Sequence, residues 1–185
     1  MNEKKKLTTK ETFVLAVKNH KKNNLQIAEN LYKEALKINP NHFESIHYLG
    51  ALLAQTKRFD LAKPLLHKAI QIQPNYVLAH NNLGNVLKEL GEHQKAISSF
   101  EKAIQINPNY VLAYNNLGKV FGELNEFNKS ANYYEKALKL DPNRKETCGG
   151  YGNLLLKSNQ HAKALSYIKK STGFISFTQK DFKII

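Results

Sequence analysis

Four prolines recur at intervals of 34 residues, and this spacing constrains the fold more than any other feature of the sequence. They stand in similar phrases: Ile38-Asn39-Pro40-Asn41, Ile72-Gln73-Pro74-Asn75, Ile106-Asn107-Pro108-Asn109 and Leu140-Asp141-Pro142-Asn143. With Asn41 counted as position 33, the repeats run over 9–42, 43–76, 77–110 and 111–144, and a degenerate fifth covers 145–171. A fixed period of this length is typical of stacked repeat units.

Small and large residues recur at the same period and predict two packed helices in each repeat. Small residues occupy position 8 (Ala16, Gly50, Gly84, Gly118, Gly152) and position 20 (Ala28, Ala62, Ala96, Ser130, Ala164). Large residues occupy position 24 (Tyr32, Leu66, Phe100, Tyr134, Ile168). Positions 4, 7, 8 and 11 share one face of a first helix, and positions 20, 24, 27 and 28 share one face of a second. Small residues at 8 and 20 let the two backbones approach closely.

Turn and stop signals divide the two helices. Position 15, where we expect the turn, holds Asn23, Lys57, Gly91, Asn125 and Asn159. Glycine and asparagine tolerate the left-handed conformation that closes a helix. Proline at position 32 ends the second helix, because the residue before it is pushed out of the helical region. Pro64, at position 22, is expected in the first turns of a second helix, where a missing amide costs least.

Together these positions resemble tetratricopeptide (TPR) repeats over roughly residues 9–171. The phrases Asn82-Leu83-Gly84 and Asn116-Leu117-Gly118 strengthen the resemblance, and the units 77–110 and 111–144 look most like those of O-linked N-acetylglucosamine transferase-type arrays and their bacterial relatives. The resemblance implies an all-α, right-handed α-solenoid of about five helical hairpins. Position 4 departs from the family because it lacks tryptophan throughout, with His80 and Cys148 among its residues.

No motif for catalysis, metal or cofactor binding is present. The seven histidines form no His-x-x-x-His pair, and the single cysteine, Cys148, can form neither an internal disulfide nor a multi-cysteine zinc site. We interpret His80 and Cys148 as packed helix residues. The sequence therefore predicts no enzyme activity, no metal, no cofactor and no small-molecule substrate.

The formal net charge of +13 raises the alternative of nucleic-acid or anionic-surface binding. The excess lies at the ends: residues 1–42 and 145–185 each carry +5, whereas residues 43–144 carry +3. It is almost all lysine, and only Arg58 and Arg144 could make the bidentate contacts that read phosphates and bases. Specific nucleic-acid binding is therefore disfavoured, and salt dependence would distinguish it from peptide binding through amides.

The face of the first helix that its hairpin core does not use is the predicted binding site. Positions 2, 6, 9 and 13 form one stripe by their three-and-four spacing. In the third and fourth repeats the stripe and the neighbouring position 5 hold Leu78, Asn81, Asn82, Asn85 and Glu89, and Leu112, Asn115, Asn116, Lys119 and Glu123. In the resembling family, first helices line a groove, and in its transferase arrays asparagine at position 6 binds extended peptide.

We expect a protein-interaction scaffold that binds an extended peptide or a partner protein in this groove. The main alternative is an accessory, substrate-recruiting segment of a larger enzyme such as a glycosyltransferase. A carboxylate clamp of the family type is rejected, because its basic positions would fall on Glu146 and Gly150. The sequence shows no signal peptide and no apolar stretch that could span a membrane, so we expect a cytoplasmic protein.

Both ends of the chain are predicted to lie outside the repeat array. Residues 1–8 form a basic tail. Residues 172–185 are apolar and include Phe174, Phe177 and Phe182. Because a solenoid normally closes with a polar cap, we expect this C-terminal tail to fold back over the last hairpin or to mediate self-association or docking of another domain.

Overall fold

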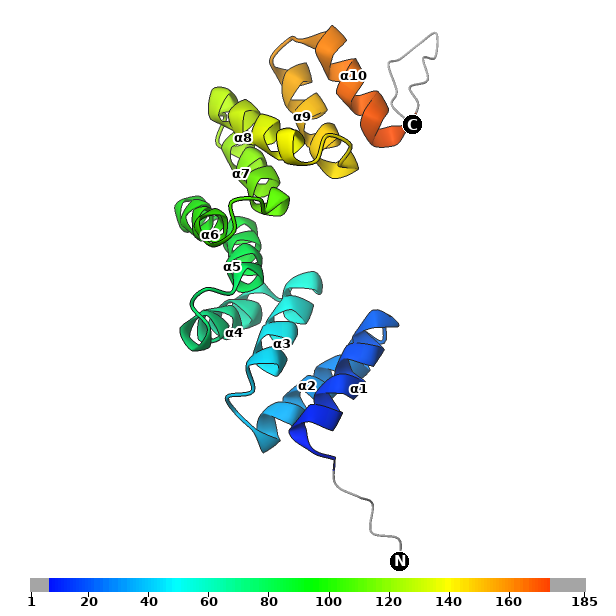
Figure 1. Ribbon diagram of the computed structural model, residues 1–185, viewed down its shortest axis with the longest axis vertical. Coiled ribbons are helices and arrows are strands. Elements are labelled where there is room, and N and C mark those ends of the chain that lie inside the picture. The colour runs from blue at the N-terminus through cyan, green and yellow to red at the C-terminus, as the bar shows by residue number, and fades with distance from the viewer. Residues whose placement is uncertain (1–6, 174–185) are drawn as a thin grey trace, which may run out of the picture. The chain divides into compact units, whose positions relative to one another are not determined.

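The computed structural model describes residues 7–173, which form ten α-helices and no strand (Figure 1). The helices are α1 Thr9–Lys21, α2 Leu25–Ile38, α3 Phe43–Gln55, α4 Phe59–Ile72, α5 Val77–Glu89, α6 His93–Ile106, α7 Val111–Glu123, α8 Phe127–Leu140, α9 Lys145–Lys157 and α10 His161–Thr172. The odd-numbered helices begin 34 residues apart, at position 1 of each repeat. The predicted all-α helical-repeat fold is confirmed.

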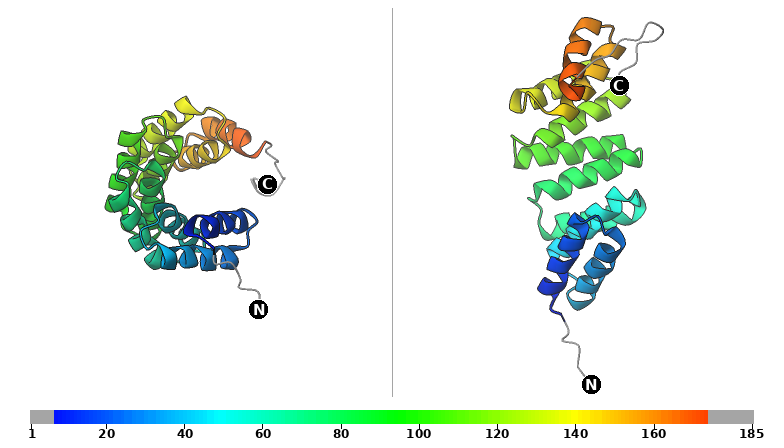
Figure 2. Two further views of the ribbon diagram at one scale, coloured as in Figure 1. Left: turned by 60° about the horizontal axis from the view of Figure 1, so that its bottom comes forward. Right: turned by 90° about the vertical axis from the view of Figure 1, so that its right-hand side faces the viewer.

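The chain divides into two compact units, Met1–Ala96 and Ile97–Ile185, and the division falls within α6. In the first unit α1 packs on α2, α2 on α3, α3 on α4 and α4 on α5. In the second unit α7 packs on α8, α8 on α9 and α9 on α10. The hairpin of α1 and α2 is drawn in blue in Figure 2. Within the units, α2, α4 and α8 thus each pack on the first helix of their own hairpin and on that of the next.

The turn within each hairpin lies at position 15, as the sequence predicted. Asn23, Lys57, Asn125 and Asn159 have φ between 58° and 61°, and Gly91 has φ of 74°. The residue after the turn donates its N–H to a carbonyl five residues back, as from Arg58 to Leu53 at 2.8 Å. This hydrogen bond satisfies a carbonyl that the helix end leaves without a partner.

The prolines at position 32 follow the ends of the second helices, and Pro64 lies in the early turns of α4, where its missing amide has a cost. Helices α2, α4, α6 and α8 end two residues before their prolines. Pro64 is the sixth residue of α4, which is beyond the first turn. In an α-helix its N–H would bond to the carbonyl of Asp60, four residues back. Pro64 therefore removes a hydrogen bond that alanine would make.

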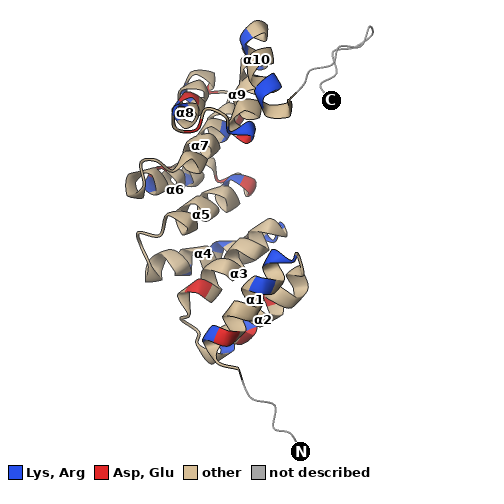
Figure 3. Ribbon diagram, turned by 45° about the vertical axis from the view of Figure 1, so that its right-hand side comes forward, with Lys and Arg blue, Asp and Glu red and all other residues tan. Residues whose placement is uncertain are grey.

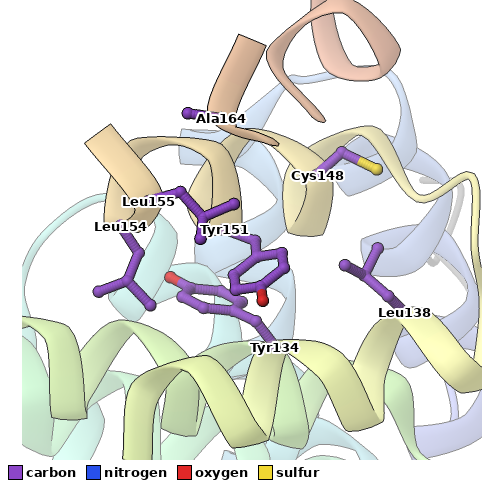
Figure 4. Packing of buried hydrophobic residues seen from close by; sticks show 7 residues of the cluster. All are labelled: Tyr134, Leu138, Cys148, Tyr151, Leu154, Leu155 and Ala164. Carbon is purple, nitrogen blue, oxygen red and sulfur yellow. The ribbon is translucent and has the colours of Figure 1, made fainter. Parts of the chain in front are cut away.

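The glycines of α9 allow close packing against neighbouring side chains. A Cβ atom added to Gly152 would lie 2.7 Å from Cγ1 of Ile168. One added to Gly150 would lie 2.8 Å from the hydroxyl of Tyr134, and one added to Gly118 would lie 2.9 Å from that ring. Tyr134 belongs to a buried cluster with Tyr151, Leu154, Leu155, Leu138, Cys148 and Ala164 (Figure 4). Glycine costs helix stability here but makes room for this core.

Ion pairs join consecutive second helices in the first unit. Arg58, at the start of α4, donates to both carboxylate oxygens of Glu29 on α2, at 3.0 and 2.6 Å. The next pair, Lys63 and Glu92 at 2.6 Å, uses the same repeat positions with the charges exchanged. Glu29 is 3% exposed, and hydrogen bonds from Arg58, then from Lys33, hold its pKa below its usual range. The carboxylate is therefore stabilised in its charged form despite its burial.

We expect Arg58→Ala to lower the free energy of unfolding by about 1–2 kcal/mol at pH 7. Loss of a partner leaves a buried charge uncompensated, but Lys33 still contacts Glu29 and Arg58 is partly exposed, which moderates the effect. Because the pKa of Glu29 is lowered in the folded state, the stability it provides is present above about pH 4.3 and is lost as the pH falls through the folded-state pKa. Urea unfolding should therefore show the difference between wild type and variant shrinking in acid. A difference that is constant with pH would contradict the assignment.

The predicted docking of the C-terminal tail concerns residues that lie almost wholly outside the described part. The last described helix ends at Thr172 and is followed by Gly173 in the left-handed conformation, with φ of 86°.

Candidate functional site

The predicted stripe lies along one side of each of two first helices, in different units of the chain. On α5 it consists of exposed Leu78, half-buried Asn82 and Asn85, and exposed Glu89. On α7 it consists of half-buried Leu112, buried Asn116, half-buried Lys119 and exposed Glu123. The equivalent positions of α5 and α7 thus differ most at position 6, where Asn82 is accessible and Asn116 is not.

The asparagines at position 5 are buried. Asn81 is 5% exposed and Asn115 is fully covered. Within residues 7–173, neither the nitrogen nor the oxygen of the Asn115 amide has a hydrogen-bond partner. Burying an amide without a partner is costly. A binding role for Asn81 and Asn115 would require them to become accessible, so direct contacts to a partner are better assigned to the exposed members of the stripe.

A pocket of about 420 Å³ lies between α3 and α5 in the first unit. Three residues of the predicted stripe, Asn82, Asn85 and Glu89, form one wall. The opposite wall comes from positions 9, 12 and 13 of α3, which are Ala51, Ala54 and Gln55. The two alanines leave room between the helices. The side-chain amides of Gln55, Asn82 and Asn85 lie around the apolar surface that the alanines provide. The pocket therefore combines apolar contact with amide donors and acceptors.

The same construction recurs in the second unit, between α7 and α9. A pocket of about 270 Å³ is lined by positions 9, 12 and 13 of α7, which are Lys119, Gly122 and Glu123. From α9 it receives positions 6, 9, 10 and 13, which are Gly150, Asn153, Leu154 and Lys157. Tyr134 of α8 completes the lining. Equivalent helix positions thus build a pocket in each unit, with amides in the first and more charged groups in the second.

His47 holds the side chain of Asn82 in place. The Asn82 amide nitrogen lies 3.2 Å from Nε2 of His47, which is at position 5 of α3. Burial lowers the pKa of His47 to about 4, so its ring is neutral at pH 7 and Nε2 can accept this hydrogen bond. The carbonyl oxygen of the Asn82 amide then remains as an acceptor on the pocket wall. His47 was not among the predicted site residues, although its place one position before the stripe was a usable signal.

His80 and Cys148 are buried helix residues, as the sequence predicted. His80 and Cys148, both at position 4, direct Nε2 and Sγ to the carbonyls of Pro74 and Pro142, at 2.8 and 3.7 Å. Burial raises the pKa of the Cys148 thiol, which makes it a poor nucleophile. In residues 7–173 no group of three or more His, Cys, Asp or Glu side chains is placed to hold a metal ion. Among the described helices, none combines the length and apolar character needed to cross a bilayer.

Comparisons with known proteins agree with the repeat pattern. Models of the TPR repeat match residues 84–125 and 111–144, and a further tetratricopeptide-repeat model matches 31–63 and 65–98. No curated protein matches the chain. The finer resemblance to transferase arrays stays a prediction.

Solved structures show the same fold over nearly the whole chain. A crystal structure of MamA is 26% identical, covers 89% of this chain and 90% of its own, and has a TM-score of 0.75. PilF of Pseudomonas aeruginosa is 21% identical, covers 92% and 78%, and has a TM-score of 0.79. YrrB, described as a TPR protein with an unusual peptide-binding site, is 18% identical, covers 88% and 84%, and has a TM-score of 0.68. The chain therefore belongs to the tetratricopeptide repeat family.

Proposed function

We propose that this protein is a non-catalytic interaction scaffold that holds an extended segment of another polypeptide against its first helices. The observation that carries the proposal is the repeated pocket. Positions 9, 12 and 13 of one first helix and positions 6, 9 and 13 of the next build it in both units. A polypeptide offers the matching groups, because its backbone N–H and C=O alternate with side chains that apolar surfaces can receive. The description of YrrB as a peptide-binding TPR protein supports the same class of ligand.

Binding of this kind is expected to be modest in affinity and tolerant of sequence. Asn82, Asn85 and Gln55 present amides that pair with any peptide backbone. Each such hydrogen bond contributes only about 0.5–1.5 kcal/mol net. Glu89 shares the first pocket with Lys57, and Glu123 shares the second with Lys119 and Lys157, so each pocket presents groups of both charges. Selectivity would therefore come from side chains in the pockets and from charge rather than from the amides.

The double variant Asn82→Ala plus Asn85→Ala should weaken binding about five- to a hundred-fold, the loss of two such hydrogen bonds. The partner is first recovered with the wild-type protein and identified by mass spectrometry, and both proteins are then titrated against it. Asn132→Ala, at an exposed position of α8 outside the pockets, is the matched control.

The fold should survive the double change, because alanine is the better helix former and neither asparagine is fully buried. Circular dichroism before titration checks this. Equal affinities of wild type and double variant, with the fold intact, would exclude the pocket of the first unit as the binding site.

A further inference from the structure

Within the described residues, α1 leaves exposed a position that is buried on α3 and α5. At position 7, Leu49 and Leu83 are each 4% exposed, whereas Leu15 is 39% exposed. The second helix of the preceding hairpin packs on the first helix in those two cases: α2 on α3 and α4 on α5. No described helix precedes α1. Leu15 therefore belongs to a surface that, elsewhere in this chain, receives a helix.

This surface is hollow and mainly apolar. A depression of about 470 Å³ is lined by Leu7, Val14 and Leu15 together with Lys10, Glu11 and Lys18; we call this set the end face. A second depression of about 890 Å³ shares Leu7 and continues along α2 past Ile38. Leu7, Val14 and Ile38 are 41%, 57% and 44% exposed. Exposed apolar surface that is contiguous and rimmed by polar residues marks interaction sites.

Two residues of α1 that differ from their equivalents in the later repeats give the end face its charge. Position 10 is Lys18, where α3 and α5 have the fully buried Leu52 and Val86. Position 3 is Glu11, whose carboxylate accepts a 2.8 Å hydrogen bond from the N–H of Thr8 in a capping box. Lys18 and Glu11 take up part of this surface with polar groups, but Leu7, Val14 and Leu15 remain as its apolar part.

The rim of the end face is basic. Lys10 and Lys18 have no carboxylate partner among the described residues, whereas the second depression is lined by both Lys37 and Glu34. The carboxylate of Glu11 is turned to its own helix cap, and this hydrogen bonding with Thr8 lowers its pKa. Figure 3 shows the charged segments of α1 and α2. A ligand that covers the apolar centre would therefore gain from acidic groups at its margins.

We propose that the end face docks an amphipathic helix of another protein, with acidic residues flanking its apolar stripe. Within the first unit a helix packs on α3 and on α5, which carry the equivalent buried leucines, and the acidic margin follows from Lys10 and Lys18. Neither alternative within the chain has this charge. The C-terminal tail, residues 174–185, carries two lysines and one aspartate, and α10 carries three lysines and no acidic residue.

The probe is a pair of synthetic peptides based on α2, the helix that packs on α3. One has the native sequence of residues 25–38 and the other has its two lysines, at 33 and 37, replaced by glutamate; both are stapled to hold the helix. We expect the acidic peptide to bind the full chain in fluorescence anisotropy at least ten-fold more tightly than the native one. Val14→Asp and Leu15→Asp should each weaken binding at least ten-fold, and Lys10→Glu plus Lys18→Glu should reverse the preference between the peptides.

Ile27→Asp is the control, because Ile27 is 52% exposed on α2 and lines neither depression. Val14 is 57% exposed, so Val14→Asp should fold normally and keeps the test valid if Leu15→Asp misfolds. Absence of acidic-peptide binding, or equal binding by wild type and Val14→Asp, would overturn the proposal. So would a dimer in sedimentation that Leu15→Asp dissociates, or tighter peptide binding after deletion of residues 174–185, since these results would assign the face to a second copy or to the tail.

Discussion

Replacing Tyr134 by alanine should lower the free energy of unfolding of the second unit by about 3–5 kcal/mol, the usual cost of removing a buried aromatic side chain. Tyr134 is 4% exposed, and its ring lies between α7 and α9, against Gly118 and Gly150. Gly118 and Gly150 have no side chain that could move into the space. The cavity would therefore collapse poorly, which places the loss toward the upper part of the range.

Two further variants, Tyr134→Phe and Tyr133→Ala, separate the contribution of the buried ring from that of its hydroxyl and from the general effect of removing a tyrosine. Tyr134→Phe should change stability by less than about 1 kcal/mol, because it preserves the ring and nearly all its volume. Tyr133→Ala, at a half-buried residue whose ring stacks on Phe121 at 5.3 Å, should cost clearly less than Tyr134→Ala. Urea unfolding monitored by circular dichroism measures all three. Equal losses for Tyr133→Ala and Tyr134→Ala would show that the ring of Tyr134 is not the centre of this core.

Pro64→Ala should stabilise the first unit by about 2 kcal/mol. Proline inside a helix costs about 3 kcal/mol relative to alanine. Proline also restricts the unfolded chain, which stabilises the folded state by about 0.4–1 kcal/mol, and the alanine variant loses this contribution. Pro64 is exposed, so that alanine loses little packing. Alanine would also donate to the carbonyl of Asp60.

Pro74→Ala is the matched control for Pro64, because Pro74 follows the end of the same helix. Its replacement restores no helical hydrogen bond and should not stabilise the protein. Thermal and urea unfolding would distinguish the two variants. A Pro64→Ala protein no more stable than wild type would mean that α4 already accommodates the ring at no cost.

The helical framework was predictable because its determinants recur in phase. The prolines at position 32 and the residues at position 15 each place a helix end, and four of the five position-15 residues are glycine or asparagine. Lys57 adopts the same left-handed conformation with a side chain that does not favour it. The period, not the residue, identified this turn. Pro64 lies in the early turns of α4 as predicted, but as the sixth residue it already removes a hydrogen bond to the carbonyl of Asp60.

The candidate site was less predictable, because burial depends on neighbouring hairpins. Asn82 and Asn116 occupy the same position in nearly identical phrases, yet only Asn116 is buried. The contact from Asn82 to His47 joins residues 35 apart and has no counterpart in the local sequence. Helix periodicity predicts which residues share a face, but not which members of that face a neighbouring helix covers.

Site-specific photo-cross-linking to a bound partner tests the binding face most directly. A photoreactive amino acid placed at Glu89 or Glu123, exposed at position 13 on α5 and α7, should form adducts with the partner recovered by the wild-type protein. The same group at Ile27 or Asn132, exposed on the second helices α2 and α8, should form few or none. Adducts from Ile27 and Asn132, with none from Glu89 and Glu123, would contradict the account and place the partner on the second helices.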